Sequence, residues 1–195
     1  MKILVAETAG FCWGVRRALD QAVDLAKKTD GRLATFGPLI HNTQKRRRYE
    51  VHHESIQVHT EKGLEFIELT QPIIEFVRQS GIQNGLVNVQ TRHTTTGIML
   101  NENEPLLLGD MKKVLEKIAS AEVPYEHDNF QIRTANLCPE ERVNGHSHCK
   151  AMVLGSSEMV NIRDGQLQLG RWQRIFLVEL DGSRAREVSV MIMGA

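Results

Sequence analysis

The chain has 195 residues, of which 41% are apolar, and it carries 24 basic and 24 acidic side chains. This length and apolar content suffice for one medium-sized globular domain, or for a small domain with an appendage. The balanced charge argues against a nucleic-acid-binding protein and against a protein of the membrane surface.

The charge is nevertheless distributed unevenly. Residues 1–48 carry ten basic and four acidic side chains, whereas residues 49–195 carry 14 basic and 20 acidic ones. The run from Lys45 to Arg48 has no aromatic residues within it, so a solvated linker is favoured over a phosphate-binding arm. We therefore predict an N-terminal fragment over residues 1–43, a basic linker over 44–48 and a main domain over 49–195.

Targeting signals are not expected. The apolar run at the N-terminus breaks at Glu7, too early for a signal peptide, and no later segment approaches twenty consecutive apolar residues. Three cysteines without regular spacing do not form a disulfide framework, which predicts a reducing, cytoplasmic location.

The N-terminal fragment predicts half of a β-α-β unit. An apolar strand at residues 2–6 is followed by a glycine-rich turn and by an apolar stripe at helical spacing over residues 15–26. A second short strand is expected within residues 33–42. Cys12 lies between Gly10 and Gly14, on a tight bend before the helix, which makes it a candidate ligand of a metal or cluster.

The main domain begins with alternating residues that predict strands near residues 49–60 and 64–70. Thr70 is expected to cap a helix that has Pro72 in its first turn and ends at Gly81. Residues 85–103 predict two strands around the polar stretch from His93 to Thr96.

The second half predicts a helix from Pro105 to about Ala119, followed by a long loop from Pro124 to Asn144. Loops of this length within compact domains are usually functional. A short helix stopped by Gly155 and several C-terminal strands complete the chain. The residues expected to face inward from the first of these helices are Leu108, Met111, Val114, Leu115 and Ile118.

Histidines supply the candidate metal ligands. His93 at a strand end, His127 in the long loop and His148 in the short helix could converge on a zinc-like ion and leave a fourth position for water or substrate. Their spacing is not that of a zinc finger, and each could also be an ordinary hydrogen-bonded or exposed imidazole.

Oxygen ligands follow His93 in the sequence. Asn101 and Glu102 belong to the stretch "NENEP", and Asp110 lies on the next helix. Carboxylate and amide oxygens suit Mg²⁺ that carries a substrate diphosphate. The same stretch could equally be a turn after a strand.

Five ordered segments of the main domain carry a family resemblance. They are "RHTTTGIMLNEN", "YEHD", "NGHSHCKAMVLGSS", "DGQLQLGRWQRIFLVELDGSR" and "VMIMG". In this order they resemble the YjbQ-like family, small proteins described as secondary thiamine-phosphate synthases. The resemblance implies an α+β fold with a β-sandwich-like arrangement and flanking helices, and it implies a homotrimer.

The resemblance also implies a site near subunit contacts. It places catalytic and metal-binding roles on His93, His127 and His148, with His146 as a weaker candidate. Glu102 and Asp110 are further candidate catalytic residues by the same resemblance. Other family positions are Asp128, Gly170, Trp172, Gln173 and Glu179. Trp172 and Gln173 are expected to be structural.

The implied reaction joins an aminopyrimidine methyl diphosphate to a thiazole phosphate and releases pyrophosphate. It needs positive charge over the leaving diphosphate, which Mg²⁺, a histidine-bound metal, protonated imidazoles or Arg184 could supply. Asn101, Asp128 and Arg184 are the candidate substrate-binding residues. Arg171 replaces the usual Thr and Ser183 the usual Pro of the family pattern.

The opening stretch carries a second resemblance. "GFCWGVRRA" and "FGPLIHN" resemble the start of hydroxymethylbutenyl diphosphate reductase, an iron-sulfur enzyme, over residues 1–43. The resemblance makes Cys12 a cluster ligand and His41 a contact of the substrate diphosphate. Neither Cys138 nor Cys149 stands in a reductase context, so we do not expect an iron-sulfur cluster.

The sequence thus predicts an enzyme, a thiamine-phosphate synthase-type transferase, that acts on small phosphorylated metabolites. Two alternatives stay open. One is an iron-sulfur reductase or cluster carrier that uses Cys12. The other is a non-catalytic trimer that binds a metal or a phosphorylated metabolite.

Overall fold

The computed structural model describes residues 49–195 together with residues 20–21, 23–24 and 27–28. Those six N-terminal residues are helical, as predicted for this stretch. The remainder of the predicted β-α-β fragment, including Cys12 and His41, lies outside the described residues. Arg48–Ala195 forms one compact unit, and no helix in the described part of the chain is long and apolar enough to cross a membrane.

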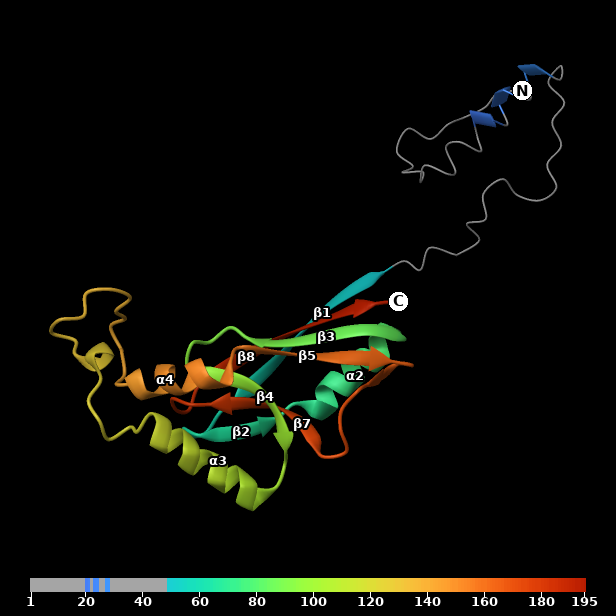
Figure 1. The fold of residues 1–195 in the computed structure, drawn as a ribbon. Helices are drawn as coiled ribbons and strands as arrows, with labels where there is room; N and C mark the ends of the chain where they lie inside the picture. Colours follow the sequence, from blue (N-terminus) through green and yellow to red (C-terminus); the bar gives the residue numbers. More distant parts are fainter. Residues whose placement is uncertain (1–19, 22, 25–26, 29–48) are drawn as a thin grey trace. The chain divides into compact units, whose positions relative to one another are not determined.

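The main domain contains two antiparallel sheets (Figure 1). The larger sheet has the order β1-β8-β3-β5-β6 and the smaller one the order β2-β7-β4. Strands of the larger sheet are β1 (Glu50–His59), β3 (Asn84–Thr91), β5 (Ser157–Arg163), β6 (Gln166–Leu167) and β8 (Ala185–Gly194). Strands of the smaller sheet are β2 (Glu65–Glu68), β4 (Thr96–Glu102) and β7 (Gln173–Glu179).

Strand β8 is an interior strand of the larger sheet. It pairs over its whole length with β1, from Glu50 opposite Gly194 to His59 opposite Ala185. On its other side it pairs with β3. The first and last strands of the domain are therefore neighbours in space.

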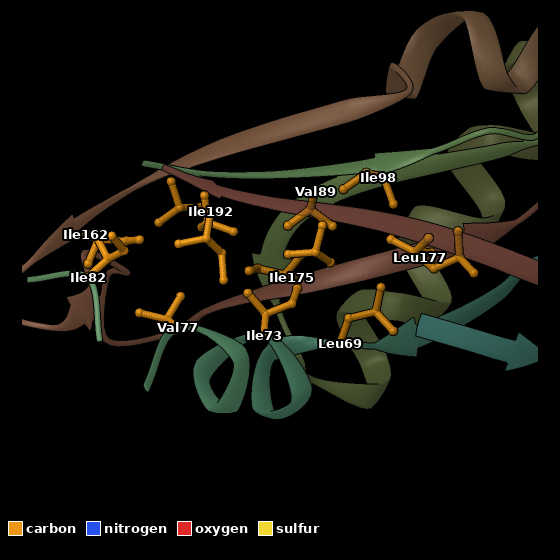
Figure 2. Close-up of a cluster of buried hydrophobic side chains, with 14 of the residues drawn as sticks. Leu69, Ile73, Val77, Ile82, Val89, Ile98, Ile162, Ile175, Leu177 and Ile192 are labelled. Atoms are coloured by element: carbon orange, nitrogen blue, oxygen red, sulfur yellow. The ribbon is translucent and has the colours of Figure 1, made fainter. Parts of the chain in front are cut away.

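Strand β7 is buried on both of its faces. Ile175 and Leu177 face the larger sheet and pack in the main core, which also contains Val89 of β3 and Ile192 of β8 (Figure 2). Phe176 faces the opposite way, into a second core beneath two helices. A strand covered on both faces needs a continuous apolar run, which explains the sequence "IFLV" at this position.

Three helices complete the fold: α2 (Thr70–Ser80), α3 (Pro105–Ile118) and α4 (Gly145–Leu154). Helix α2 closes the main core with Ile73 and Val77 (Figure 2). Helices α3 and α4 cover the outer face of the smaller sheet with Leu115 and Leu154. This mixture of packed sheets and helices confirms the predicted α+β fold.

The start of α2 differs from the prediction. Leu69, not Thr70, occupies the N-cap position. The Thr70 hydroxyl instead accepts a hydrogen bond of 2.9 Å from the backbone N–H of Ile175 in β7. At the other end of the helix, Gly81 adopts the left-handed conformation expected of a helix-terminating glycine.

The inward face predicted for α3 is wrong in part. Only Leu115 is fully buried, whereas Val114 and Ile118 are 54% and 49% exposed. The helix lies at the edge of the fold, so one apolar row contacts the sheet and the next borders an open apolar hollow of about 280 Å³. Lys150 of α4, itself buried, donates to Glu116 and so connects α4 to α3.

A buried ion pair joins the two sheets. Arg186 of β8 donates to both carboxylate oxygens of Glu179 in β7, each bond being 2.6 Å long. Arg186 also donates to the Thr95 hydroxyl, and the Thr60 hydroxyl donates to Glu179. Glu179 is fully buried and Arg186 is 4% exposed.

The same carboxylate organises the connection between β7 and β8. Its Oε1 atom accepts backbone N–H groups of Leu180 and Asp181 at 3.1 and 2.9 Å. A buried charge is tolerated only when its hydrogen bonds are satisfied, and Glu179 meets that condition. The turn leading to Arg184 is fixed as a consequence.

Acid should weaken this ion pair. Burial alone would raise the pKa of Glu179, but the hydrogen bonds from Arg186, the Asp181 backbone and Thr60, together with the charge of Arg186, outweigh burial and hold the pKa below its ordinary value. The stabilisation is therefore complete above about pH 4.3, the ordinary glutamate pKa, and is lost as the pH falls through the lower, folded-state pKa. Urea unfolding from pH 7 to pH 3 should show this loss.

The variant Glu179→Gln provides the comparison. We expect its free energy of unfolding at pH 7 to be lower by about 3–5 kcal/mol, because Arg186 is left buried without a counter-charge. We also expect a shallower loss of stability between pH 4.5 and pH 3 than in the wild type. Identical acid profiles for the two proteins would contradict the role given to this pair.

Candidate functional site

The structure brings His93, His127 and His148 to the wall of one pocket of about 470 Å³. His93 lies in the turn between β3 and β4, His127 in the short 3-10 helix Glu126–Asp128, and His148 in the first turn of α4. The three predicted histidines thus come from three separate elements and meet at one cavity.

Arginines surround these histidines. Arg92, Arg133, Arg184 and Arg186 line the same pocket, and Glu141 is the one acidic residue in its wall within the described part of the chain. The remaining wall is polar. It consists of Thr94, Thr95, Asn136 and Asn144.

His93 is held as a neutral imidazole. Its Nε2 atom accepts a hydrogen bond of 2.9 Å from the backbone N–H of Glu187. Burial lowers the pKa of His93, and the nearby Arg186 lowers it further. The neutral tautomer that accepts at Nε2 carries its proton at Nδ1, so His93 offers one N–H donor.

His127 and His148 contact each other directly. Their ring centroids are 4.6 Å apart and the ring planes make an angle of 63°, an edge-to-face arrangement. Burial lowers the pKa of His148, and the neighbouring His127 and Arg133 lower it further. The Nε2 atom of His127 is buried and has no hydrogen-bond partner in residues 49–195.

Arg184 sits at the edge of this pocket with one donor unused. Its Nη2 atom lies 2.8 Å from the Asp181 carboxylate. Its Nε atom is buried and makes no hydrogen bond within the described chain. Arg184 was predicted to contact substrate, and it is placed where it could.

Arg133 has a different role in the same wall. Its guanidinium donates to the backbone oxygens of His127, Ala135 and Asn136 at 2.9–3.3 Å and contacts Glu141 at 3.4 Å. Arg133 thereby holds the long loop together from inside, and its charge is matched by Glu141. The predicted loop between Pro124 and Asn144 contains no long helix or strand, but hydrogen bonds within the loop hold it together.

Asp128 caps helix α4. Its Oδ1 atom accepts the backbone N–H groups of Asn144 and Gly145, both at 2.9 Å. A Cβ atom on Gly145 would approach Tyr125 Cβ to 2.5 Å, so only glycine allows this close approach. Asp128 was predicted to bind substrate. In the structure it accepts the free N–H groups at the N-terminus of α4 and so positions His148 in the first turn of that helix.

Three predicted oxygen ligands lie elsewhere. Asn101 and Glu102 are on β4, and Asp110 on α3 pairs with Lys113 at 2.9 Å on the surface. Asn101 and Asp110 border the apolar hollow beside α3, and none of the three lines the histidine pocket. His146 likewise lies outside that pocket, next to Ser147 and Tyr125.

The predicted metal centre does not fit the side chains as they are arranged. His93 already uses its Nε2 lone pair to accept the Glu187 N–H. Among the described residues, no group of three or more His, Cys, Asp or Glu side chains is placed to hold a metal ion. No step below is therefore assigned to a zinc-like ion at the histidines. Mg²⁺ carried by a diphosphate stays a prediction, and Cys12, the candidate cluster ligand, lies outside the described residues.

Several pocket residues were missed by the sequence analysis. Arg92, Arg133 and Arg186 are separated in sequence, and nothing in their spacing marks them as neighbours. Glu179 gave a usable signal, since a lone carboxylate at the end of the apolar run "IFLVEL" indicates a buried, paired charge. The same pattern does not identify Arg186 as the partner of Glu179.

Known proteins match both parts of the chain. A family described as "UPF0047 protein YjbQ-like" matches residues 54–195. A UPF0047 protein of Methanothermobacter thermautotrophicus is 35% identical over 145 residues, which cover 74% of this chain and 94% of that protein. The crystal structure of a YbjQ-like protein of unknown function from Sulfolobus solfataricus is 31% identical, with a TM-score of 0.69, and covers 76% of this chain and 100% of its own.

The N-terminal part matches a different family. A family described as "LytB protein" matches residues 3–96. A 4-hydroxy-3-methylbut-2-enyl diphosphate reductase of Anaeromyxobacter is 50% identical over 44 residues, which cover 23% of this chain and only 16% of the reductase. Both predicted resemblances are confirmed, the second as a short LytB-like segment.

These matches correct the predicted activity. The matching family and its relatives are described without an activity, and the Sulfolobus structure is described as that of a protein of unknown function. The prediction of a thiamine-phosphate synthase, which came from family resemblance, is therefore wrong. Membership of this family does not support that activity.

Removal of the α4 cap should destabilise the pocket wall. We expect Asp128→Ala to lower the free energy of unfolding by about 1–2 kcal/mol, because two backbone N–H groups lose their acceptor. Asp110→Ala is the matched control: it removes an exposed carboxylate in a surface pair and should change stability by no more than about 0.5 kcal/mol. Urea unfolding at pH 7 measures both, and equal effects would argue against the capping role.

Proposed function

The chain belongs to the UPF0047 family of YjbQ-like proteins, and we propose that its histidine-lined pocket binds a small molecule carrying a phosphate group. Family membership brings no activity with it, so the proposal depends on the chemistry of the pocket. The observation that carries it is the meeting of three histidines and Arg184 in the wall of one pocket.

The Arg184 side chain lines the pocket and is partly exposed. Its contact with Asp181, at 2.8 Å, holds the guanidinium group in place. A phosphate oxygen is the acceptor that a guanidinium group binds best, in a charge-assisted hydrogen bond.

The wider pocket supports an anion. Its wall contains four arginines, of which Arg133, Arg184 and Arg186 pair with Glu141, Asp181 and Glu179. Arg92 is largely exposed and only loosely paired with Glu187, at 3.4 Å, so it can turn toward a ligand. His93 adds a neutral N–H donor, and Thr94 and Thr95 add hydroxyl groups to the wall.

Replacing Arg184 tests phosphate binding. Titration calorimetry with inorganic phosphate at fixed ionic strength should show binding to the wild type and at least tenfold weaker binding to Arg184→Gln, because one charge-assisted hydrogen bond and one positive charge are lost. Arg163→Gln is the control, since Arg163 is exposed and distant in the fold, on β5. If phosphate binds both variants equally, the anion site is not this pocket.

The contact between His127 and His148 favours a second function at the same site, which is acid-base catalysis on the bound phosphate ester. In a hydrolysis, one imidazole would take a proton from the attacking water as the P–O bond forms. The other would give a proton to the leaving oxygen as the ester P–O bond breaks. Two imidazoles in contact at one cavity wall can divide these tasks.

Phosphate release from phenyl phosphate distinguishes catalysis from binding. We expect His148→Gln to lower the rate by at least about 100-fold, the usual contribution of a general acid or base, while the affinity for inorganic phosphate changes less than threefold. If the wild type releases phosphate no faster than buffer does, the pocket is a binding site without this activity.

A cytoplasmic location and a homotrimer belong to the same proposal. The location is supported by cysteine usage, and Cys138 and Cys149 are free thiols in the structure. Light scattering of the purified protein measures the number of subunits.

A further inference from the structure

We propose that a groove between helix α2 and strand β6 binds an extended, acidic peptide segment of a partner protein, which adds to the larger sheet as a further strand. The groove has a volume of about 530 Å³. It shares no lining residue with the histidine pocket, so this site is independent of the function proposed above.

The groove has an apolar floor between polar walls. Ile74 and Val77 line it from α2, and Leu167 and Leu169 line it from β6 and the residues that follow. Ile74 is 40% exposed, so part of this floor is open to a ligand. Amides offer both donors and acceptors, which suits the backbone of a peptide. The amide side chains of the walls are those of Gln71, Gln166 and Gln173.

Strand β6 is an edge strand of the larger sheet, and only one side of it is paired. The Gln168 N–H donates to the Asn161 carbonyl of β5 at 2.9 Å. Because the backbone groups of an antiparallel strand point alternately to its two sides, those of Leu167 and Leu169 point away from β5. Leu169 makes no backbone–backbone hydrogen bond within residues 49–195. Both leucines line the groove, so it borders an open strand edge with which a peptide can pair.

The charges beside the groove favour an acidic partner. Arg78 donates to both carboxylate oxygens of Glu75, and its charge is balanced there. Arg174 lies 3.7 Å from the Glu68 carboxylate. Arg171 instead stacks on the neighbouring tryptophan, 4.7 Å from the ring centroid, and forms no ion pair in the described part of the chain. An acidic residue of the peptide complements this uncompensated charge.

Trp172 provides an anchor at the same end of the groove. Arg171 and Trp172 are the middle residues of a turn closed by the bond from the Gln173 N–H to the Gly170 carbonyl. Leu169 and Gln173, on either side of these two residues, line the groove. Trp172 was expected to be structural, yet it is 58% exposed. Tryptophan and arginine are the side chains most enriched among those that dominate binding energy at protein interfaces.

A synthetic peptide tests the strand addition. The probe is acetyl-Glu-Leu-Thr-Leu-Thr-Leu-Glu-amide, which alternates apolar and polar residues between two acidic ends. Calorimetry should show that it binds the purified protein. Of two further peptides, one methylated on its leucine nitrogens and one on its threonine nitrogens, one should bind at least tenfold more weakly and the other within threefold. The reason is that the N–H groups of only every second residue face the protein strand.

Two variants test the groove itself. Arg171→Gln should weaken binding of the acidic peptide about tenfold, but should change binding of a peptide with Gln in place of both Glu residues less than threefold. Ile74→Ser should weaken both peptides about tenfold, because apolar contact is lost. The matched controls are Arg142→Gln and Val143→Ser, both at exposed residues of the long loop that do not line the groove.

Three results would overturn the proposal. The first is that the acidic peptide does not bind the wild type, or that both methylated peptides bind as well as the unmodified one. The second is that the controls lose as much affinity as Arg171→Gln and Ile74→Ser. The third is that these two variants lower the number of subunits measured by light scattering, because the groove would then be an interface between copies of this chain.

Discussion

The buried ion pair between Glu179 and Arg186 is the interaction on which the site depends. One partner belongs to the smaller sheet and the other to the larger sheet, so the pair fixes how the two sheets meet. Glu179 also binds the backbone before Arg184, and Arg186 binds Thr95 beside His93. Two walls of the pocket are therefore positioned by one pair of opposite charges, and a shift of either sheet would separate them.

Most charges near the pocket are already satisfied inside the protein. Asp128 accepts the N–H groups at the N-terminus of α4, so this helix end is not open to a phosphate, and Arg133 holds the loop together. Few side chains therefore remain free to bind a ligand, chiefly Arg184 and the imidazoles. Arginines and carboxylates thus have two different roles at this pocket. Some hold the cavity wall together, and others are free to contact a ligand.

Sequence patterns predicted the elements better than the contacts between them. The continuous apolar run of β7, the loop before α4 and the helix ended by Gly81 followed from local chemistry, and the three histidines were expected to meet. The assignment of Asn101 and Asp110 to the same site rested on proximity in sequence to His93, but β4 carries the chain away from the pocket after that turn. Thr70 failed as a cap because its hydroxyl bonds to a strand 105 residues later, which no local pattern records.

The position of β8 between β1 and β3 has a consequence for biosynthesis. The ladders that β8 forms with β1 and with β3 need residues 185–194, which are made after every other strand of the domain. During translation, the strands already made expose unpaired edges and the apolar side chains that later fill the main core. Folding is expected to be slow, because the pairing of β1 with β8 joins segments that are distant in the sequence.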